Sequence, residues 1–353
     1  MRQALEMARR GWGTTHPNPM VGALIVEDDQ VVAIGYHAKA GEAHAEVVAL
    51  KSLGRPPKPN AVLYVTLEPC CTHGRTPPCV DAIIASGIRK VVIGAVDPNP
   101  AHAGKGLDLL RQKGITVVSG VLANEATDLN LIFNHWITHQ RPLIAMKLAS
   151  TADFRLVHAE KTIRTISCAL SRADVHHWRK LFPAVAVSVD TLLADNPYLT
   201  ARLPHSESCS IRFVLDRHFR SAQKINLNLF QDKYRSQTIV VGLKKSASSD
   251  VLNSYESAEI KVWLIDGDEN QFLPNWIQRC TIEKIIGVYI EAGPRLASVL
   301  IKNKIADYFF LYFAKSQIGD PESLPWSQSG IPQLRETITS QFEKDTLTRG
   351  FLI

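Results

Sequence analysis

Short apolar runs alternate with helical periodicity through roughly the first 140 residues. Runs of strand length predict strands at Val21–Val26, Val31–Gly35, Val62–Leu67, Lys90–Ala95 and Ile115–Ser119. Apolar residues spaced three to four apart predict helices at 1–10, from His44 to about Leu53, at Cys79–Ser86, at Gly106–Lys113 and from about Glu125 to His139. This alternation predicts an αβα sandwich that begins with a strand hairpin.

A second alternating series follows Arg141-Pro142, where proline ends the first pattern. Its apolar runs are Leu143–Ala149, Ala184–Val189, Ile211–Leu215, Thr238–Leu243, Ile260–Ile265, Ile285–Ile290 and Tyr308–Phe313, and its helical stretches include Ser171–Lys180 and Pro294–Lys302. The chain is longer than one hydrophobic core usually supports, so we predict two α/β domains, residues 1–141 and 142–353. Residues 321–351 have weak periodicity and are not placed by the pattern.

Composition narrows the class of protein without selecting a substrate. The 353 residues are 45% hydrophobic and 21% charged, which is ordinary for a globular protein. The net charge of +6 contains no long block of like charges, so it suits an anionic small substrate as well as RNA.

The cysteines and the N-terminal residues indicate a reduced, cytoplasmic protein. The six cysteines, at positions 70, 71, 79, 168, 209 and 280, lack the spacing of a disulfide framework. The first ten residues are amphipathic and lack the apolar core of a signal peptide. No stretch approaches about 18 consecutive apolar residues, so we expect no membrane span.

One histidine and two cysteines lie at element boundaries where they could share a metal. His44 opens a predicted helix, Cys70 follows a predicted strand, and Cys79 opens the next helix. An imidazole and two thiolates suit a Zn²⁺ ion with its fourth position left open to water. Glu46 lies two residues after the histidine, and we expect it to carry protons rather than bind the metal. A His-x-Glu followed by a Pro-Cys pair is the pattern of zinc deaminases.

Three alternatives remain open at this point. The general deaminase pattern has two residues between its cysteines, whereas eight separate Cys70 from Cys79. Cys71 is therefore an alternative first ligand, although Cys70 has the expected place after Pro69. A closed structural zinc site would recruit Cys71 or His73 as a fourth ligand. A nucleic-acid deaminase would need the short cysteine spacing and a basic, aromatic channel, and neither is evident.

Four segments around these residues resemble the bifunctional deaminase-reductases of riboflavin biosynthesis. They are Thr15-His-Pro-Asn-Pro-Met-Val-Gly22, Gly35-Tyr-His-Ala-Lys-Ala-Gly-Glu-Ala-His-Ala-Glu46, Leu67-Glu-Pro-Cys-Cys-Thr-His-Gly-Arg-Thr-Pro-Pro-Cys79, and Asp97-Pro-Asn-Pro100 with Gly104-Lys-Gly106. The segments follow one another in the order that the family has, and the similarity continues through most of the second domain.

The resemblance implies a cytidine-deaminase-like first domain. Its reaction would be the zinc-dependent hydrolytic deamination of a diaminopyrimidine that carries a phosphoribosylamino group. The substrate would be bound by Asn18, His37, His73, Arg75 and Thr76, with the planar guanidinium of Arg75 suited to the phosphate. Asn18 can equally be the centre of a Pro-Asn-Pro turn. The partner is then a small molecule rather than a nucleic acid or a membrane, and a homo-oligomer is compatible with this reading.

The second domain resembles the dihydrofolate-reductase-like half of the same family, which uses NADPH to reduce the ribosyl group to ribityl. Shared segments include Lys147-Leu-Ala149, Arg172-Ala-Asp-Val175, Thr191-Leu-Leu-Ala-Asp-Asn-Pro-Tyr-Leu-Thr200 and Ile290-Glu-Ala-Gly-Pro294. By position in these segments, the resemblance implies cofactor contacts at Ala149, Thr191, Asp195 and Gly293, and substrate contacts at Arg179, Leu199, Arg202 and Glu291.

Several positions of the second domain depart from the family pattern. They are Phe154, Ser188, Asp190 and Ala292 at positions where the family often has glycine, Arg217 where a small hydroxyl residue is common, and Ile163 and Thr165 in place of a polar and an aromatic contact. Bulk in place of glycine can block the approach of a cofactor, and an acid at 190 would repel a phosphate that it faced. The alternative is thus a deaminase whose second domain no longer reduces.

Overall fold

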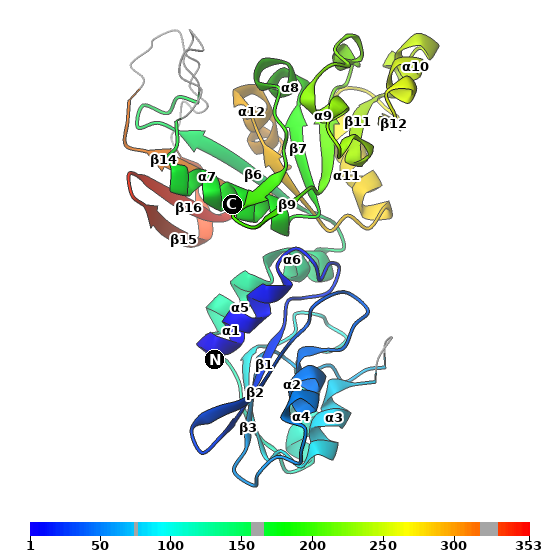
Figure 1. Cartoon of the computed structure of the whole chain (residues 1–353). Coiled ribbons are helices and arrows are strands. Elements are labelled where there is room, and N and C mark those ends of the chain that lie inside the picture. Colours follow the sequence, from blue (N-terminus) through cyan, green and yellow to red (C-terminus); the bar gives the residue numbers. More distant parts are fainter. Residues whose placement is uncertain (74–76, 157–165, 318–330) are drawn as a thin grey trace. The chain divides into compact units, whose positions relative to one another are not determined.

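The computed structural model describes residues 1–73, 77–156, 166–317 and 331–353. Its internal contacts divide the chain into two compact units, Met1–Gln140 and Arg141–Ile353 (Figure 1). Within the described residues, none of the helices combines the length and apolar character that a membrane span requires.

The first unit is built on a five-stranded sheet in the order β2-β1-β3-β4-β5. Strand β1 pairs antiparallel with β2 and β3, whereas β3, β4 and β5 run parallel to one another. The strands are β1 (Gly22–Glu27), β2 (Gln30–Tyr36), β3 (Val62–Leu67), β4 (Lys90–Ala95) and β5 (Thr116–Val118).

Helices cover both faces of this sheet, with α1 and α5 on one face and α2, α3 and α4 on the other (Figure 1). The helices are α1 (Arg2–Ala8), α2 (Ala45–Leu53), α3 (Cys79–Ser86), α4 (Lys105–Gln112), α5 (Ala123–Leu129) and α6 (Leu131–His139). The predicted αβα sandwich is confirmed. Gly35 of β2 allows α2 to approach closely, because a Cβ at this position would lie 2.2 Å from the Ala45 carbonyl oxygen.

The second unit is built on a nine-stranded sheet in the order β12-β11-β10-β7-β13-β6-β14-β16-β15. The strands from β12 to β14 in this order are parallel, and β16 and β15 add an antiparallel edge. They are β6 (Leu143–Ser150), β7 (Ala184–Ser188), β10 (Ile211–Leu215), β11 (Thr238–Leu243), β12 (Lys261–Ile265), β13 (Gly287–Glu291), β14 (Tyr308–Ala314), β15 (Leu334–Phe342) and β16 (Asp345–Leu352), with a separate pair β8 (Ala201–Leu203) and β9 (Ser206–Ser208).

The two faces of this sheet differ in character. The helices of the unit are α7 (Ala169–Leu181), α8 (Val189–Asp195), α9 (Asn228–Gln231), α10 (Ser249–Ser257), α11 (Phe272–Ile282) and α12 (Pro294–Lys302). On one face, Trp276 of α11 and Leu300 of α12 join an apolar core with alternate residues of the strands. On the other face, Trp178 of α7 packs against Phe310 with the ring centroids 4.7 Å apart. Lys147 and Glu291 lie on this second face, as neighbours on β6 and β13.

Several element bounds differ by one or two residues from those that the sequence pattern predicted, and two differences have a clear structural cause. The helix predicted from about Glu125 to His139 is two helices that meet at Asn130, whose side chain bonds both the N–H and the carbonyl of Met20. The strand predicted to end at Val189 ends at Ser188, because the Ser188 hydroxyl caps α8 by accepting from the Thr191 N–H. The described part of residues 321–351 forms β15 and most of β16.

A buried guanidinium ties three segments of the second unit together. Arg212 of β10 has no exposed side-chain surface and donates to both carboxylate oxygens of Asp232, at 2.6 and 2.8 Å. It also donates to the Thr238 hydroxyl and to the carbonyls of Tyr198 and Leu229. The loop that precedes β8 is therefore held to the sheet by a buried charge.

We predict that Arg212→Ala lowers the free energy of unfolding by about 3–5 kcal/mol, because Asp232 loses the partner of a buried ion pair. The matched control is Arg235→Ala, which removes an exposed pair with Glu259 and should cost about 1 kcal/mol or less. Urea unfolding followed by circular dichroism measures both. Equal costs for the two variants would contradict the assignment of Arg212 as a structural tie.

Candidate functional site

Three potential metal ligands of the first unit meet where one strand ends and two helices begin. His44 is the N-cap of α2, Cys79 is the first residue of α3, and Cys70 follows β3. His44 Nδ1 lies 3.1 Å from the Cys79 sulfur and 3.5 Å from the Cys70 sulfur. The three ligand atoms all lie within 4.8 Å of one another, and they are the single cluster of this kind among the described residues.

The donor set and its spacing fit a zinc ion. Bonds of about 2.0 Å to nitrogen and about 2.3 Å to sulfur at the tetrahedral angle put the ligand atoms about 3.5 Å apart. The observed separations of 3.1 and 3.5 Å need only small adjustments to reach this geometry. Three protein ligands leave one tetrahedral position for water, as in catalytic zinc sites.

The two thiols share one proton before any metal binds. The Cys79 thiol and the His44 ring lower the pKa of Cys70 to about 4, so Cys70 is a thiolate at neutral pH. Hydrogen bonding to that thiolate, together with burial, raises the pKa of Cys79. A divalent cation deprotonates a coordinating thiol, so zinc binding here releases a proton.

Glu46 lies in the first turn of α2 with its side chain in the interior. It is 3% exposed, and burial raises its pKa to about 7. A carboxyl group whose pKa lies near the working pH can accept a proton and return it. The charge of a zinc ion beside it would favour the carboxylate form. Glu46 is not one of the three clustered ligands, so it is available for proton transfer.

Asn18 and His37 form a hydrogen-bonded pair beside this cluster. The Asn18 amide nitrogen lies 3.1 Å from His37 Nε2, and the other ring nitrogen lies 3.2 Å from the Ala43 carbonyl. An amide nitrogen can only donate, so Nε2 accepts and the proton resides on Nδ1. Burial lowers the pKa of His37, which is consistent with a neutral ring. His37 thus fixes the orientation of Asn18 and packs edge-on against the His44 ring.

The remaining residues predicted for the first site fall between β3 and α3 in the sequence. His73 is exposed, whereas Arg75 and Thr76 fall outside the described residues. Cys71 does not join the ligand cluster; its sulfur lies 3.7 Å from His102 Nδ1. Among the described residues, the geometry therefore brings Cys70 rather than Cys71 to the metal site.

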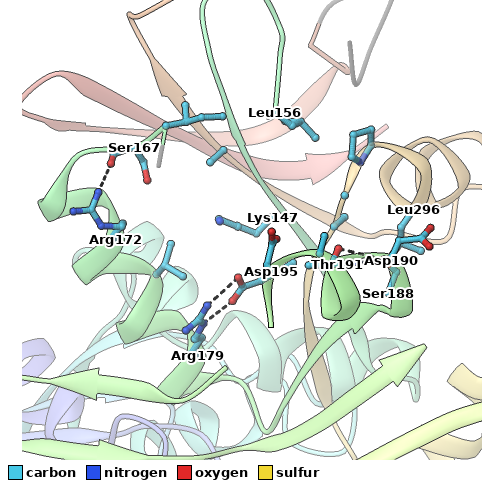
Figure 2. A pocket seen from close by; sticks show the side chains of 18 of the residues that line it. Lys147, Leu156, Ser167, Arg172, Arg179, Ser188, Asp190, Thr191, Asp195 and Leu296 are labelled. Carbon is cyan, nitrogen blue, oxygen red and sulfur yellow. Dashed lines mark hydrogen bonds and ion pairs between the residues drawn. The ribbon is translucent and has the colours of Figure 1, made fainter. Parts of the chain in front are cut away.

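The second unit contains a cavity of about 570 Å³ at the carboxyl ends of its central strands. Figure 2 shows the side chains of Lys147, Arg179, Thr191 and Asp195 around it. Seven of the eight residues predicted for cofactor or substrate line this one cavity: Ala149, Arg179, Thr191, Asp195, Arg202, Glu291 and Gly293. The eighth, Leu199, is 2% exposed and is not part of the lining.

Opposite charges face one another on the floor of this cavity. Arg179 donates to both oxygens of Glu291, at 2.5 and 3.0 Å, and to the Thr200 carbonyl. Burial opposes the charged form of Glu291, yet Arg179 and Lys147 hold its pKa down to about 2. Burial lowers the pKa of Lys147. The cavity therefore presents an ionised carboxylate between two cationic groups.

Lys147 and His176 are two proton-carrying residues of the lining to which sequence reasoning gave no role. Lys147 belongs to the segment Lys147-Leu-Ala149 that resembles the family, but no role was predicted for it from the sequence. A lysine inside a buried strand is itself a signal of function. His176 lies on α7 one turn before Arg179, and burial, Arg179 and Arg202 lower its pKa to about 4. Its Nδ1 lies 3.1 Å from the Thr200 carbonyl oxygen and 3.2 Å from the Arg202 backbone nitrogen, so a neutral imidazole sits among guanidinium groups.

Two positions that depart from the family pattern, Phe154 and Asp190, find partners in the structure. Phe154 is not part of the cavity lining; its ring packs against Phe313 with the centroids 6.1 Å apart. Asp190 lines the cavity but pairs with Arg220 at 2.6 Å and with Arg295 at 3.7 Å. These guanidinium groups offset the repulsion that an acid would exert on a phosphate.

The other departures are less informative. Arg217 pairs with Glu269 at 2.8 Å, and Ala292 lines the cavity next to Gly293. Ile163 and Thr165 lie outside the described residues.

Two family descriptions match the chain in succession. Residues 1–95 match the cytidine and deoxycytidylate deaminase zinc-binding region, and residues 142–348 match the RibD C-terminal domain.

Relatives from several bacteria match almost the whole chain. The riboflavin biosynthesis protein RibD of Aquifex aeolicus is 37% identical, over 98% of this chain and 93% of its own length. The RibD of Synechocystis is 39% identical, over 96% of this chain and 90% of its own length.

Solved structures match over the same extent. A Thermotoga maritima protein described as a diaminohydroxyphosphoribosylaminopyrimidine deaminase/5-amino-6-(5-phosphoribosylamino)uracil reductase is 32% identical, with a TM-score of 0.84 over 100% of this chain and 97% of that one. Acinetobacter baumannii RibD is 31% identical, with a TM-score of 0.79 over 99% and 97% of the two chains.

The geometry of the metal site predicts different roles for its neighbouring cysteines. Cys79→Ser should lose most of the bound zinc, because a hydroxyl is a poor substitute for a thiolate ligand. Cys71→Ser should keep about one zinc per chain, because three ligands complete the site without it. Metal analysis of the two purified variants measures this. Loss of zinc from Cys71→Ser would indicate a closed, four-ligand structural site.

Proposed function

Because this chain belongs to the RibD family of riboflavin-biosynthesis proteins, we propose that it carries out two successive reactions on one pyrimidine. The first is the zinc-dependent hydrolytic deamination of 2,5-diamino-6-(5-phosphoribosylamino)pyrimidin-4-one. The second is the NADPH-dependent reduction of the ribosyl group of 5-amino-6-(5-phosphoribosylamino)uracil to ribityl. The observation that carries the first reaction is the meeting of three zinc ligands beside the buried carboxyl group of Glu46.

In the deamination, we assign Glu46 as the proton carrier. His44, Cys70 and Cys79 would hold a Zn²⁺ ion, which would supply Lewis-acid activation of water near neutral pH. Hydrolysis forms a carbon–oxygen bond at the ring carbon and breaks its bond to the exocyclic nitrogen, which leaves as ammonia. Glu46 would pass one proton of the attacking water to the ring nitrogen, and then the second proton, from the new hydroxyl group, to the amine that leaves as ammonia. The position of Glu46 supports this role, because its carboxyl group is buried beside the three ligands and burial raises its pKa, which makes it a stronger proton acceptor.

We assign recognition of the pyrimidine edge to Asn18. Its amide is held by His37, whose other ring nitrogen is occupied by the Ala43 carbonyl, so the amide is fixed before the substrate arrives. His37 then acts through Asn18 as well as by lining the site. His73, Arg75 and Thr76 remain our candidates for the phosphoribosyl end.

In the reduction, we assign the cofactor to Ala149, Thr191, Asp195 and Gly293. NADPH bound there would supply the hydride for the conversion of the ribosyl group to ribityl. Thr191 and Gly293 lie close enough to contact the same cofactor, because a Cβ on Gly293 would lie 3.4 Å from the Thr191 hydroxyl. These residues line a cavity of about 570 Å³, which is large enough for a ligand.

We assign the substrate of the reduction to Arg179, Arg202, Glu291 and Leu199. Arg202 places a guanidinium in the cavity for a phosphate, and Leu199, whose side chain is buried, would contribute its backbone. Hydride addition to the ribose carbon leaves the ring oxygen in need of a proton. The ammonium group of Lys147, whose pKa burial lowers, is placed in the cavity to donate it.

The cellular setting follows from this chemistry. We propose a cytoplasmic enzyme whose partner is the small phosphoribosyl pyrimidine, with no role for nucleic acid or membrane. We also propose that the protein forms a homo-oligomer. Light scattering of the purified protein would measure its mass in solution.

One assay tests both reactions. Purified protein is given the diaminopyrimidine substrate, and ammonia release and NADPH oxidation are followed together. Both signals should rise, with NADPH oxidation lagging behind ammonia. Ammonia release without NADPH oxidation by folded protein would reduce the assignment to a deaminase alone.

We predict that Glu46→Gln keeps its zinc but releases ammonia at least about 100-fold more slowly, because glutamine cannot carry the proton. The matched control is Glu42→Gln, an exposed carboxyl group on the same segment, which should stay within about twofold of the unaltered protein. Zinc analysis and an ammonia assay measure both variants. Near-normal ammonia release by Glu46→Gln would remove this residue from the mechanism.

Arg179→Gln should reduce NADPH oxidation at least about 100-fold while ammonia release stays unchanged, because Glu291 loses its partner and the substrate loses a cation. Arg279→Gln is the control, since it removes an exposed guanidinium from an i,i+4 pair with Glu283. The test supplies the deaminated uracil directly and follows NADPH absorbance. Unchanged oxidation by Arg179→Gln would contradict the placement of the substrate in this cavity.

A further inference from the structure

We propose that Glu68 is a positioning residue of the metal site, which holds the segment Asp97–Gly106 against the strand end that carries Cys70. The inference rests on the proposed deamination at His44, Cys70 and Cys79. Glu68 directly follows β3 and lies two residues before Cys70. It is 4% exposed, so its carboxyl group is satisfied by partners within the protein.

Three backbone N–H groups converge on this one carboxylate. Gly106 N donates to Oε1 at 2.9 Å, while Asp97 N and Gly104 N donate to Oε2 at 3.1 and 2.9 Å. All three donors come from one segment, which runs from the end of β4 to the first turn of α4. The segment therefore curves around the Glu68 carboxylate, which holds its two ends together.

The fit between this loop and the strand end is close. A Cβ on Gly106 would lie 2.4 Å from the Pro69 carbonyl oxygen and 3.1 Å from Glu68 Oε1. Only glycine allows this approach without displacing backbone. The N-terminus of α4 thus touches the residue that immediately precedes Cys70.

Cys70 is consequently held from two directions. From α3, the Val80 N–H donates to the Cys70 carbonyl at 3.2 Å, and the Cys79 N–H donates to its sulfur at 3.3 Å. From the other side, the Glu68 clamp fixes the backbone of residues 68 and 69 against the loop. Partners of this kind orient metal ligands, and their loss typically reduces metal affinity or activity about 10–100-fold.

A glutamine at position 68 tests the clamp with little change in shape. It keeps one acceptor oxygen but turns an NH₂ group toward N–H donors, so at least one buried N–H loses its partner. Gly106→Ala tests the same contact from the opposite side, because it leaves the carboxylate in place and forces α4 away from Pro69.

The chain offers a matched control in Glu27, at the end of β1. This carboxyl group is 2% exposed, accepts two bonds from Arg55 and one from the Lys58 N–H, and lies in the same unit. It lies near the start of β3, whereas Cys70 follows the end of that strand. Glu27→Gln therefore perturbs a buried carboxylate of the same kind away from the metal ligands.

The experiment compares Glu68→Gln, Gly106→Ala and Glu27→Gln in the full chain by two readouts besides ammonia release. In cobalt-substituted protein, the sulfur-to-cobalt charge-transfer bands should shift for the first two variants and stay unchanged for Glu27→Gln. Hydrogen exchange of the amides in residues 97–106 should accelerate for the first two variants alone. Deamination kcat/KM should fall about 10–100-fold for these two, with zinc content and NADPH oxidation of supplied uracil retained.

Two results would overturn the inference. One is a cobalt spectrum of Glu68→Gln that matches the unaltered protein; the other is a loss of activity equal to that of Glu27→Gln, which would mark a general effect on stability. Failure of the proposed function would look different. The unaltered protein would then release no ammonia, while the cobalt spectra and hydrogen exchange would still report whether Glu68 positions the metal site.

Discussion

The first unit depends on bringing two sulfur atoms and one imidazole within 4.8 Å of one another, at a site where Cys79 is buried and His44 and Cys70 are half-buried. Charge at such a site is costly unless helix ends and a cation offset it. The fold provides the helix ends, since Cys79 opens α3 and His44 caps α2. The N–H at the start of α3 donates to the Cys70 sulfur and favours its thiolate form, so the architecture prepares this ligand before the metal arrives.

The same principle governs the cavity of the second unit, where ionised groups are buried without a metal. Glu291 keeps its charge because Arg179 and Lys147 face it, and neighbouring parallel strands deliver two of these three residues side by side. Asp190 is more exposed than Glu291 and is likewise paired with two cationic side chains, those of Arg220 and Arg295. In both cases the carboxylate stays ionised beside cationic side chains, and these side chains can also bind an anionic ligand.

Sequence reasoning predicted local features well and long-range ones poorly. Strand positions such as Val62–Leu67 and the helix start at Cys79 follow from periodicity, which depends only on neighbouring residues. The break at Asn130 depends on Met20, more than a hundred residues away, and no local signal marks it. Strand β15 escaped the pattern because it is the exposed edge of its sheet, where the alternation of apolar and polar residues is weak.

The departures from the family pattern show how bulk can replace glycine without filling a site. Phe154 adopts a φ of +58°, a conformation that costs a bulky residue energy, and its ring turns toward Phe313 rather than the cavity. Contact with the apolar core offsets part of that cost. Ser188 gains a role that glycine lacks, because its hydroxyl caps the helix on which Thr191 lies. The cavity thus keeps its lining residues while the backbone around it is fixed by side chains instead of by glycine turns.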